Sequence, residues 1–219
     1  MKPFIVFLAV LQLAVLAGRI EAQTLNWGSA AFSDLYDSEG MELGSTFVFE
    51  LGAFDAGFTP TEENVDFWLA NWRVFDTASY VAENGVFTGT EEIHEVTNYE
   101  SLFAGLNAYI WVRNGGTPGP ETEWFLARKS TGPDAWVFPD LDPGCCPNGE
   151  VTQWSLSALG SETPVWGNQG GNLGGGEFSV TGNFELQTHV VPEPASPLMA
   201  LMAASVGILR RRRAHSSLN

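Results

Sequence analysis

Basic side chains are scarce in this chain, which has 10 Lys and Arg residues against 26 Asp and Glu. Six basic residues, Lys2, Arg19 and 210–213, and two acidic ones, Glu21 and Glu193, lie in the terminal segments. The body from 23 to 191 is left with four basic and 24 acidic side chains, a net charge of −20. Because nucleic acids are bound through their phosphates by Lys and Arg, this deficit excludes nucleic acid as a partner.

Long hydrophobic runs are also missing, since both apolar stretches are shorter than the roughly 20 residues of a typical membrane-spanning helix. The first, 4–17, follows the positive Lys2 and is followed by a polar segment that ends in a small residue, Ala22. This order predicts a secretory signal peptide over 1–22, cleaved between Ala22 and Gln23. A retained anchor is the weaker alternative, because no stop-transfer charges follow. The body is therefore expected outside the cytoplasm.

The second apolar stretch, 198–209, has Val191, Pro192, Glu193 and Pro194 before it and Arg210, Arg211, Arg212 and Arg213 after it. Guanidinium groups keep their charge and resist translocation, so the arginines should stay inside and act as the membrane stop. We expect a single transmembrane helix over about 195–210 and a short cytoplasmic tail over 214–219. The uninterrupted run is roughly 12 residues, so the span is marginal and needs snorkelling by Arg210 or a thin bilayer. A buried core helix is the alternative, disfavoured by the two prolines and the basic block.

This order of a Pro-Glu-Pro element, an apolar helix and an arginine block resembles the PEP-CTERM sorting signal of Gram-negative bacteria. The resemblance covers the segment 190–213. It implies recognition by an exosortase, a membrane transpeptidase that cuts near Pro-Glu-Pro and releases or transfers the exported domain. It also implies anchoring in the inner membrane before processing, and a final place at the cell surface or in the extracellular matrix.

Cysteine is limited to the adjacent pair Cys145 and Cys146, in a loop rich in Pro and Gly. Export favours oxidation, so a disulfide between these neighbours is one expectation. Their Cα atoms would be only about 3.8 Å apart, which would strain such a bond. An intermolecular bridge and free thiols are the alternatives. A zinc site needs more ligands than this loop offers, and we expect no metal and no cofactor.

The body, 23–189, is long enough for one domain. The full chain has 24 Gly and 12 Pro, a composition that favours short strands joined by turns. We expect a mainly β fold, an antiparallel β-sandwich with one short helix. Strands are expected near 24–32 (an edge strand), 47–54, 73–80, 85–90, 106–113, 123–128, 151–155 and 178–190. In the last of these, Phe178, Phe184, Leu186 and Val190 share one parity and polar residues such as Gln187 and His189 the other. This pattern predicts a half-buried antiparallel strand, or a hairpin bent at Gly182 and Asn183.

One helix is expected after Thr59, which can act as its N-cap with Glu62 completing a capping box. Pro60 fits the first helical position. Val65, Trp68, Leu69 and Trp72 then recur at helical spacing and should form one apolar face against a sheet.

Catalytic patterns are weak, and we expect no catalytic residue. Pairing of Glu91, Glu92 or Glu95 with Glu121 or Glu123 would suit glycoside hydrolysis, but such pairs arise by chance in an acidic chain. His94 and His189 have no recognisable nucleophile partner. The acidic turn with Asp34, Asp37 and Glu39 lacks the spacing of a calcium-binding loop, so a solvated turn is expected there. The Gly-rich run 167–176 lacks the Lys of a phosphate-binding loop, so a flexible surface loop is expected.

Tryptophan is abundant, with 8 residues. Most should be buried in the core, but Trp136, Trp154 and Trp166 lie near expected loops and are candidates for stacking on sugar rings. Two functions follow. The protein is a non-catalytic, membrane-tethered surface or matrix component, in contact with exopolysaccharide, or it is a secreted carbohydrate-binding or carbohydrate-active domain.

Overall fold

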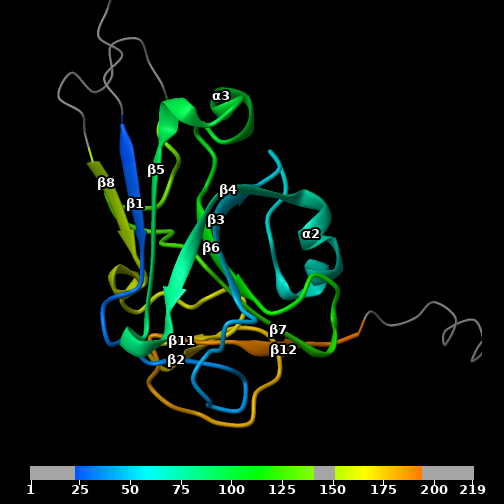
Figure 1. Cartoon of the computed structure of the whole chain (residues 1–219). Coiled ribbons are helices and arrows are strands. Elements are labelled where there is room, and N and C mark those ends of the chain that lie inside the picture. The colour runs from blue at the N-terminus through cyan, green and yellow to red at the C-terminus, as the bar shows by residue number, and fades with distance from the viewer. Residues whose placement is uncertain (1–22, 141–150, 194–219) are drawn as a thin grey trace, which may run out of the picture.

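Two β-sheets make up the part of the chain that the computed structural model describes, residues 23–140 and 151–193 (Figure 1). The larger sheet has eight strands in the order β12-β7-β6-β3-β4-β5-β1-β8. These strands are β1 (Thr24–Gly28), β3 (Val48–Phe54), β4 (Trp72–Val81), β5 (Val86–Glu92), β6 (Tyr109–Arg113), β7 (Gly119–Ala127), β8 (Val151–Ser155) and β12 (His189–Val191).

The smaller sheet has four two-residue strands in the order β10-β9-β11-β2, namely β2 (Leu35–Tyr36), β9 (Asn168–Gln169), β10 (Asn172–Leu173) and β11 (Leu186–Gln187). Single helical turns join the strands: η1 (Glu62–Phe67), α2 (Trp68–Asn71), η2 (Ala82–Asn84), η3 (Ile93–Glu95), α3 (Tyr99–Leu102) and η4 (Leu156–Leu159). The mainly β class is confirmed, and so is the helical segment between β3 and β4.

Most neighbouring strands pair antiparallel, as the sequence predicts, but two pairs are parallel: β1 with β8, and β11 with β2. The expected edge position of the first strand is wrong. β1 lies between β5 and β8, because β8 returns late in the chain and adds alongside it. Figure 1 shows β8, β1 and β5 together on one side of the molecule and α2 on the other.

The central strands β3 and β6, and the second half of β7 from Trp124 onward, are buried on both faces. Residues of one parity, such as Phe49, Ile110 and Phe125, enter one hydrophobic cluster. Residues of the other parity, such as Trp111 and Trp124, enter a second cluster. Because successive side chains of a strand point to opposite faces, these segments have to be apolar at nearly every position.

The second cluster is built from tryptophans. Trp68 of α2 stacks on Trp124 with ring centroids 5.8 Å apart and meets Trp111 and Trp166 edge-on at 5.9 and 6.0 Å. Trp68, Trp111 and Trp124 have no exposed surface. Offset and edge-to-face contacts of this kind add to the stabilisation that burial gives. The helical segment η1–α2 therefore covers this cluster.

The helix differs in detail from the expectation. It begins two residues later, after Thr61, whose backbone N–H donates to Asn64 Oδ1 at 2.8 Å, so Thr59 and Glu62 are not its capping pair. Its first part is a 3-10 helix, in which the apolar spacing of an α-helix does not apply. Leu69 is consequently exposed, and Trp72 already belongs to β4.

The expected strand over 178–190 is mostly wrong. Regular pairing is limited to β11 and β12, and Gln187 and His189, expected on the wet face, are fully buried. They are buried because the chain passes under the Gly-rich segment 167–176, which is a folded hairpin of β9 and β10 rather than a flexible loop. Gly170 and Gly171, both at positive φ, make its turn.

Glu50 of β3 lies on the face of the sheet that carries the tryptophan cluster, where apolar side chains are the rule. This carboxylate is only 5% exposed. Arg113 of β6 binds it through two nitrogens, Nη2 to Oε1 at 2.8 Å and Nε to Oε2 at 3.2 Å. Trp72 Nε1 donates to the same Oε2 at 3.0 Å. Three charge-assisted hydrogen bonds thus compensate for removing this carboxylate from water.

Glu162, in the loop after η4, holds the segment that follows β7. Its carboxylate accepts the backbone N–H and hydroxyl of Ser130, both at 2.6 Å, and those of Thr131 at 3.1 and 2.8 Å. Partial burial pushes the pKa of Glu162 upward, but these four hydrogen bonds outweigh it and lower the pKa to about 2.

Substitution of Glu50 tests the buried ion pair. We expect Glu50→Ala to lower the free energy of unfolding by about 3–5 kcal/mol, because it leaves Arg113 and the Trp72 indole without their acceptor. The matched control is Asp55→Ala, which breaks the half-exposed Asp55–Arg73 pair and should cost about 1 kcal/mol or less. Urea unfolding followed by tryptophan fluorescence measures both. Equal losses in the two variants would contradict the argument.

Substitution of Glu162 tests the second carboxylate. Its folded pKa lies below the ordinary 4.5, so its stabilisation is complete above pH 4.5 and is lost as the pH falls toward about 2. We expect the wild type to lose more stability than Glu162→Gln over this window, in acid titrations of the urea midpoint. Glu121→Gln, at an exposed position of β7, should keep the wild-type slope.

Candidate functional site

The sorting segment starts inside the fold. β12 pairs with β7, with Val190 opposite Glu123 and Val191 opposite Gly119. Val191 is fully buried in the tryptophan cluster, whereas Pro192 and Glu193 are exposed. The change from core to solvent therefore takes place in a single step of the chain, at the start of the Pro-Glu-Pro element.

His189 fixes β12 from within. Its Nδ1 lies 2.8 Å from the carbonyl oxygen of Gly175, its ring stacks on Phe178 at 4.3 Å, and its own carbonyl accepts Trp166 Nε1 at 3.1 Å. Since a carbonyl oxygen only accepts, Nδ1 carries the proton. Nε2 is buried without a hydrogen-bond partner among the described residues. Burial lowers the pKa of His189, against a smaller opposing effect of the Gly175 hydrogen bond.

The other residues predicted to matter at the termini, and the two cysteines, lie outside the described part of the chain, except for Gln23. These are Ala22, Pro194, the arginines Arg210 to Arg213, the span 195–210, and Cys145 with Cys146. Gln23, on the far side of the predicted signal cleavage, is buried, and its Nε2 donates to Thr152 Oγ1 at 3.3 Å. Within 23–140 and 151–193, no helix has the length and apolar character needed to cross a membrane.

The tryptophans proposed for sugar stacking are buried, so the expectation of exposed rings is wrong. Trp136, Trp154 and Trp166 are 1%, 5% and 3% exposed. Trp136 and Trp154 stack on each other at 6.1 Å, and Trp166 packs in the cluster beneath α2. Trp136 and Trp154 share one hydrophobic cluster with Leu156 and Leu159 of η4, a long-range packing that the sequence pattern did not reveal.

The carboxylates considered for hydrolysis are not brought together as pairs. Glu91 and Glu92 lie on β5 and Glu123 lies on β7, and three strands, β4, β3 and β6, separate β5 from β7. Glu123 instead accepts the backbone N–H of Ser38 at 2.8 Å and the Thr188 hydroxyl at 2.6 Å. Its position is explained by these structural hydrogen bonds.

Two acidic groups of the structure bear on metal binding, and the sequence pattern raised only the first as a candidate. Asp37 Oδ1 accepts the backbone N–H groups of Glu39 and Met41, which is the solvated turn that the sequence predicts. Among the described residues, the one group with three ligand atoms within 4.8 Å of one another is Glu92, His94 and Glu95. All three are exposed.

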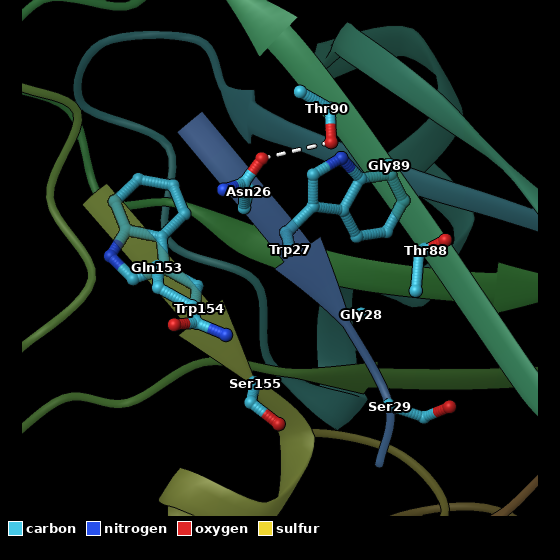
Figure 2. Close-up of a pocket in the computed structure, with 10 residues that line it drawn as sticks. All are labelled: Asn26, Trp27, Gly28, Ser29, Thr88, Gly89, Thr90, Gln153, Trp154 and Ser155. Carbon is cyan, nitrogen blue, oxygen red and sulfur yellow. Dashed lines mark hydrogen bonds between the residues drawn. The ribbon is translucent and has the colours of Figure 1, made fainter. Parts of the chain in front are cut away.

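A groove of about 320 Å³ runs over β5, β1 and β8 (Figure 2). The register sets side chains beside one another in two rows: Thr90, Asn26 and Gln153, then Thr88, Gly28 and Ser155. Thr88, Thr90 and Gln153 are exposed, and Asn26 and Ser155 are half-buried. Trp27 and Trp154 have the opposite parity and belong to the core. The sequence pattern does not reveal this groove, because it depends on β8 pairing with a strand more than a hundred residues away.

A second hollow, of about 380 Å³, lies where the segment 32–36 meets the β4–β5 turn. The Tyr36 hydroxyl donates to Asp34 Oδ1 at 3.4 Å, and the negative charge of Asp34 raises the pKa of Tyr36. Burial, and then the charge of Glu42, raise the pKa of Tyr80. This hollow is therefore acidic, in contrast to the groove over β1.

The pH dependence of folding tests the state of His189. Its folded pKa lies below 6.5, so the unfolded chain binds the proton more tightly, and stability should fall as the pH decreases below 6.5. We expect His189→Gln to reduce this slope in urea unfolding between pH 5 and 8. His94→Gln, at an exposed position, should leave the slope as it is. A wild-type slope in His189→Gln would contradict the burial argument.

Comparison with known proteins adds one finding. The family model of the PEP-CTERM protein-sorting motif matches residues 190–213. No curated protein and no solved structure shows a significant match. The chain thus carries at its C-terminal end a PEP-CTERM sorting motif, which begins within the last strand of the fold.

Proposed function

We propose that this protein is exported, tethered in the inner membrane by its C-terminal segment, and then placed at the cell surface or in the extracellular matrix by an exosortase-type transpeptidase. The sorting motif suggests the export and the processing enzyme. The signal sequence at 1–22 and the arginine block at 210–213 agree with this order of events. The folded body has a non-catalytic role in this proposal.

One structural observation supports the proposal: the motif leaves the fold immediately after its last core residue, Val191. Cleavage at or after Pro192 would remove no core side chain of the part of the chain that the structure describes. Four Cα–Cα steps join Val191 to Ala195, where the predicted span begins, and they extend at most about 14 Å. The tethered body must therefore lie close to the membrane, within reach of an enzyme embedded there.

A non-catalytic body agrees with what the described carboxylates do. Glu50, Glu123 and Glu162 each accept hydrogen bonds that hold the fold together. The carboxylates whose pairing would suit glycoside hydrolysis, such as Glu91 and Glu123, lie on separate strands. A carbohydrate-active role therefore has less support than surface display.

Cell fractionation with intact-mass measurement tests the proposal in a Gram-negative host that has an exosortase. We expect the wild-type chain to start at Gln23, to leave the cytoplasm, and to lose its tail C-terminal to Val191. Changing Pro192, Glu193 and Pro194 together to Ala should leave an exported but uncut chain in the inner membrane. The uncut variant should unfold like the wild type, because the exposed Pro192 and Glu193 make no core contact.

Insertion of ten Gly and Ser residues between Val191 and Pro192 tests whether processing depends on the short linker. Because the enzyme is embedded in the membrane and the motif leaves the fold after Val191, the insertion should not prevent the loss of the tail. Recovery of the full-length chain in the cytosol, with Met1 still present, would overturn the proposal.

A further inference from the structure

The groove over β5, β1 and β8 presents an ordered array of hydrogen-bonding side chains. Neighbouring strands are about 4.8 Å apart, and side chains on one face repeat about every 7 Å along a strand. The rows Thr90–Asn26–Gln153 and Thr88–Gly28–Ser155 therefore form a flat grid. Figure 2 shows the first row, with Thr90 bonded to Asn26 across the strands.

Gly28 makes the grid concave. It has φ of 153°, and a Cβ atom here would lie 2.2 Å from the Phe87 carbonyl oxygen, so no other residue fits without moving β5. The middle of the second row consequently has no side chain. Thr88 on one side and Ser155 on the other stand above this gap, which gives the groove its depth.

Much of the hydrogen-bonding capacity of the grid is unused within the described part of the chain. Thr90 Oγ1 donates to Asn26 Oδ1 at 2.8 Å, which leaves the Asn26 amide NH₂ available. The side chains of Gln153 and Thr88 make no hydrogen bond to another described residue. Amides and hydroxyls both donate and accept, so the surface can bind a ligand that also does both.

The lining carries no charged side chain, although the body has a net charge of −20. An anionic ligand would be repelled by this body, and a cationic ligand would find more charge in the acidic hollow at Asp34 and Glu42. A neutral ligand with hydroxyl groups along its length fits this open, two-row groove. We propose that the groove binds a neutral oligosaccharide, a site that goes beyond the proposed sorting and does not depend on it.

Isothermal titration calorimetry on the full-length chain, in a detergent without a sugar headgroup, tests this site. The probes are neutral hexasaccharides of glucose, mannose and galactose, with a hexamer of uronic acid as the charged comparison. At least one neutral probe should bind, and the uronate at least about tenfold more weakly. Asn26→Ala and Gln153→Ala should each weaken binding by about twofold to twelvefold, the loss expected for one hydrogen bond.

Thr77→Ala is the matched control, an exposed hydroxyl on β4 of the same sheet but outside the groove, and it should bind like the wild type. Gln153→Ala should melt within about 2 °C of the wild type, because its side chain makes no hydrogen bond to another residue of 23–140 and 151–193. Absence of binding by every neutral probe at millimolar concentration would sink the inference. So would equal binding of the uronate, unchanged affinity in both groove variants, or a preference for an extended peptide paired to the edge of β8.

Discussion

Burial of the strands β3 and β6 and of the second half of β7 on both faces is the constraint from which the rest of this fold follows. A strand with two dry faces needs two separate coverings. One face is covered by the curved continuation of the same sheet, through Leu25, Phe87 and Trp154, and the other by the helical turn with Trp68 and the segment with Trp166. Each fully buried large side chain contributes about 1.5–3 kcal/mol to stability. The free energy lost on removing either covering would therefore exceed the net stability of a typical domain.

The shortage of basic residues shapes how charge is managed. Each of the four basic side chains of the body has a defined partner. Arg113 binds the buried Glu50, Arg73 binds Asp55, Lys129 binds Asp134, and Arg128 lies over the ring of Tyr109. None is left for the remaining surface carboxylates, which therefore repel one another and other anions. The groove over β1, lined only by neutral groups, is distinct for this reason.

The sorting tail and the groove lie at opposite ends of the strand order. β12, which leads into the tail, is the first strand of the large sheet, and β8, which borders the groove, is the last. A body held close to the membrane through β12 would thus keep its groove at the far edge of the sheet. Display of a binding surface and attachment by a short linker are compatible in this arrangement.

The sequence by itself determined the mainly β class, the strands near 47–54, 73–80, 85–90, 123–128 and 151–155, and the sorting motif. Alternation, chain-local turns and an apolar segment next to fixed charge are properties of neighbouring residues. Only the tertiary structure decided the burial of Glu50, His189 and the three tryptophans expected at the surface, and the groove formed where β8 joins β1. Each of these depends on which distant segment covers a face or extends an edge, and that choice is made by packing between residues far apart in the chain.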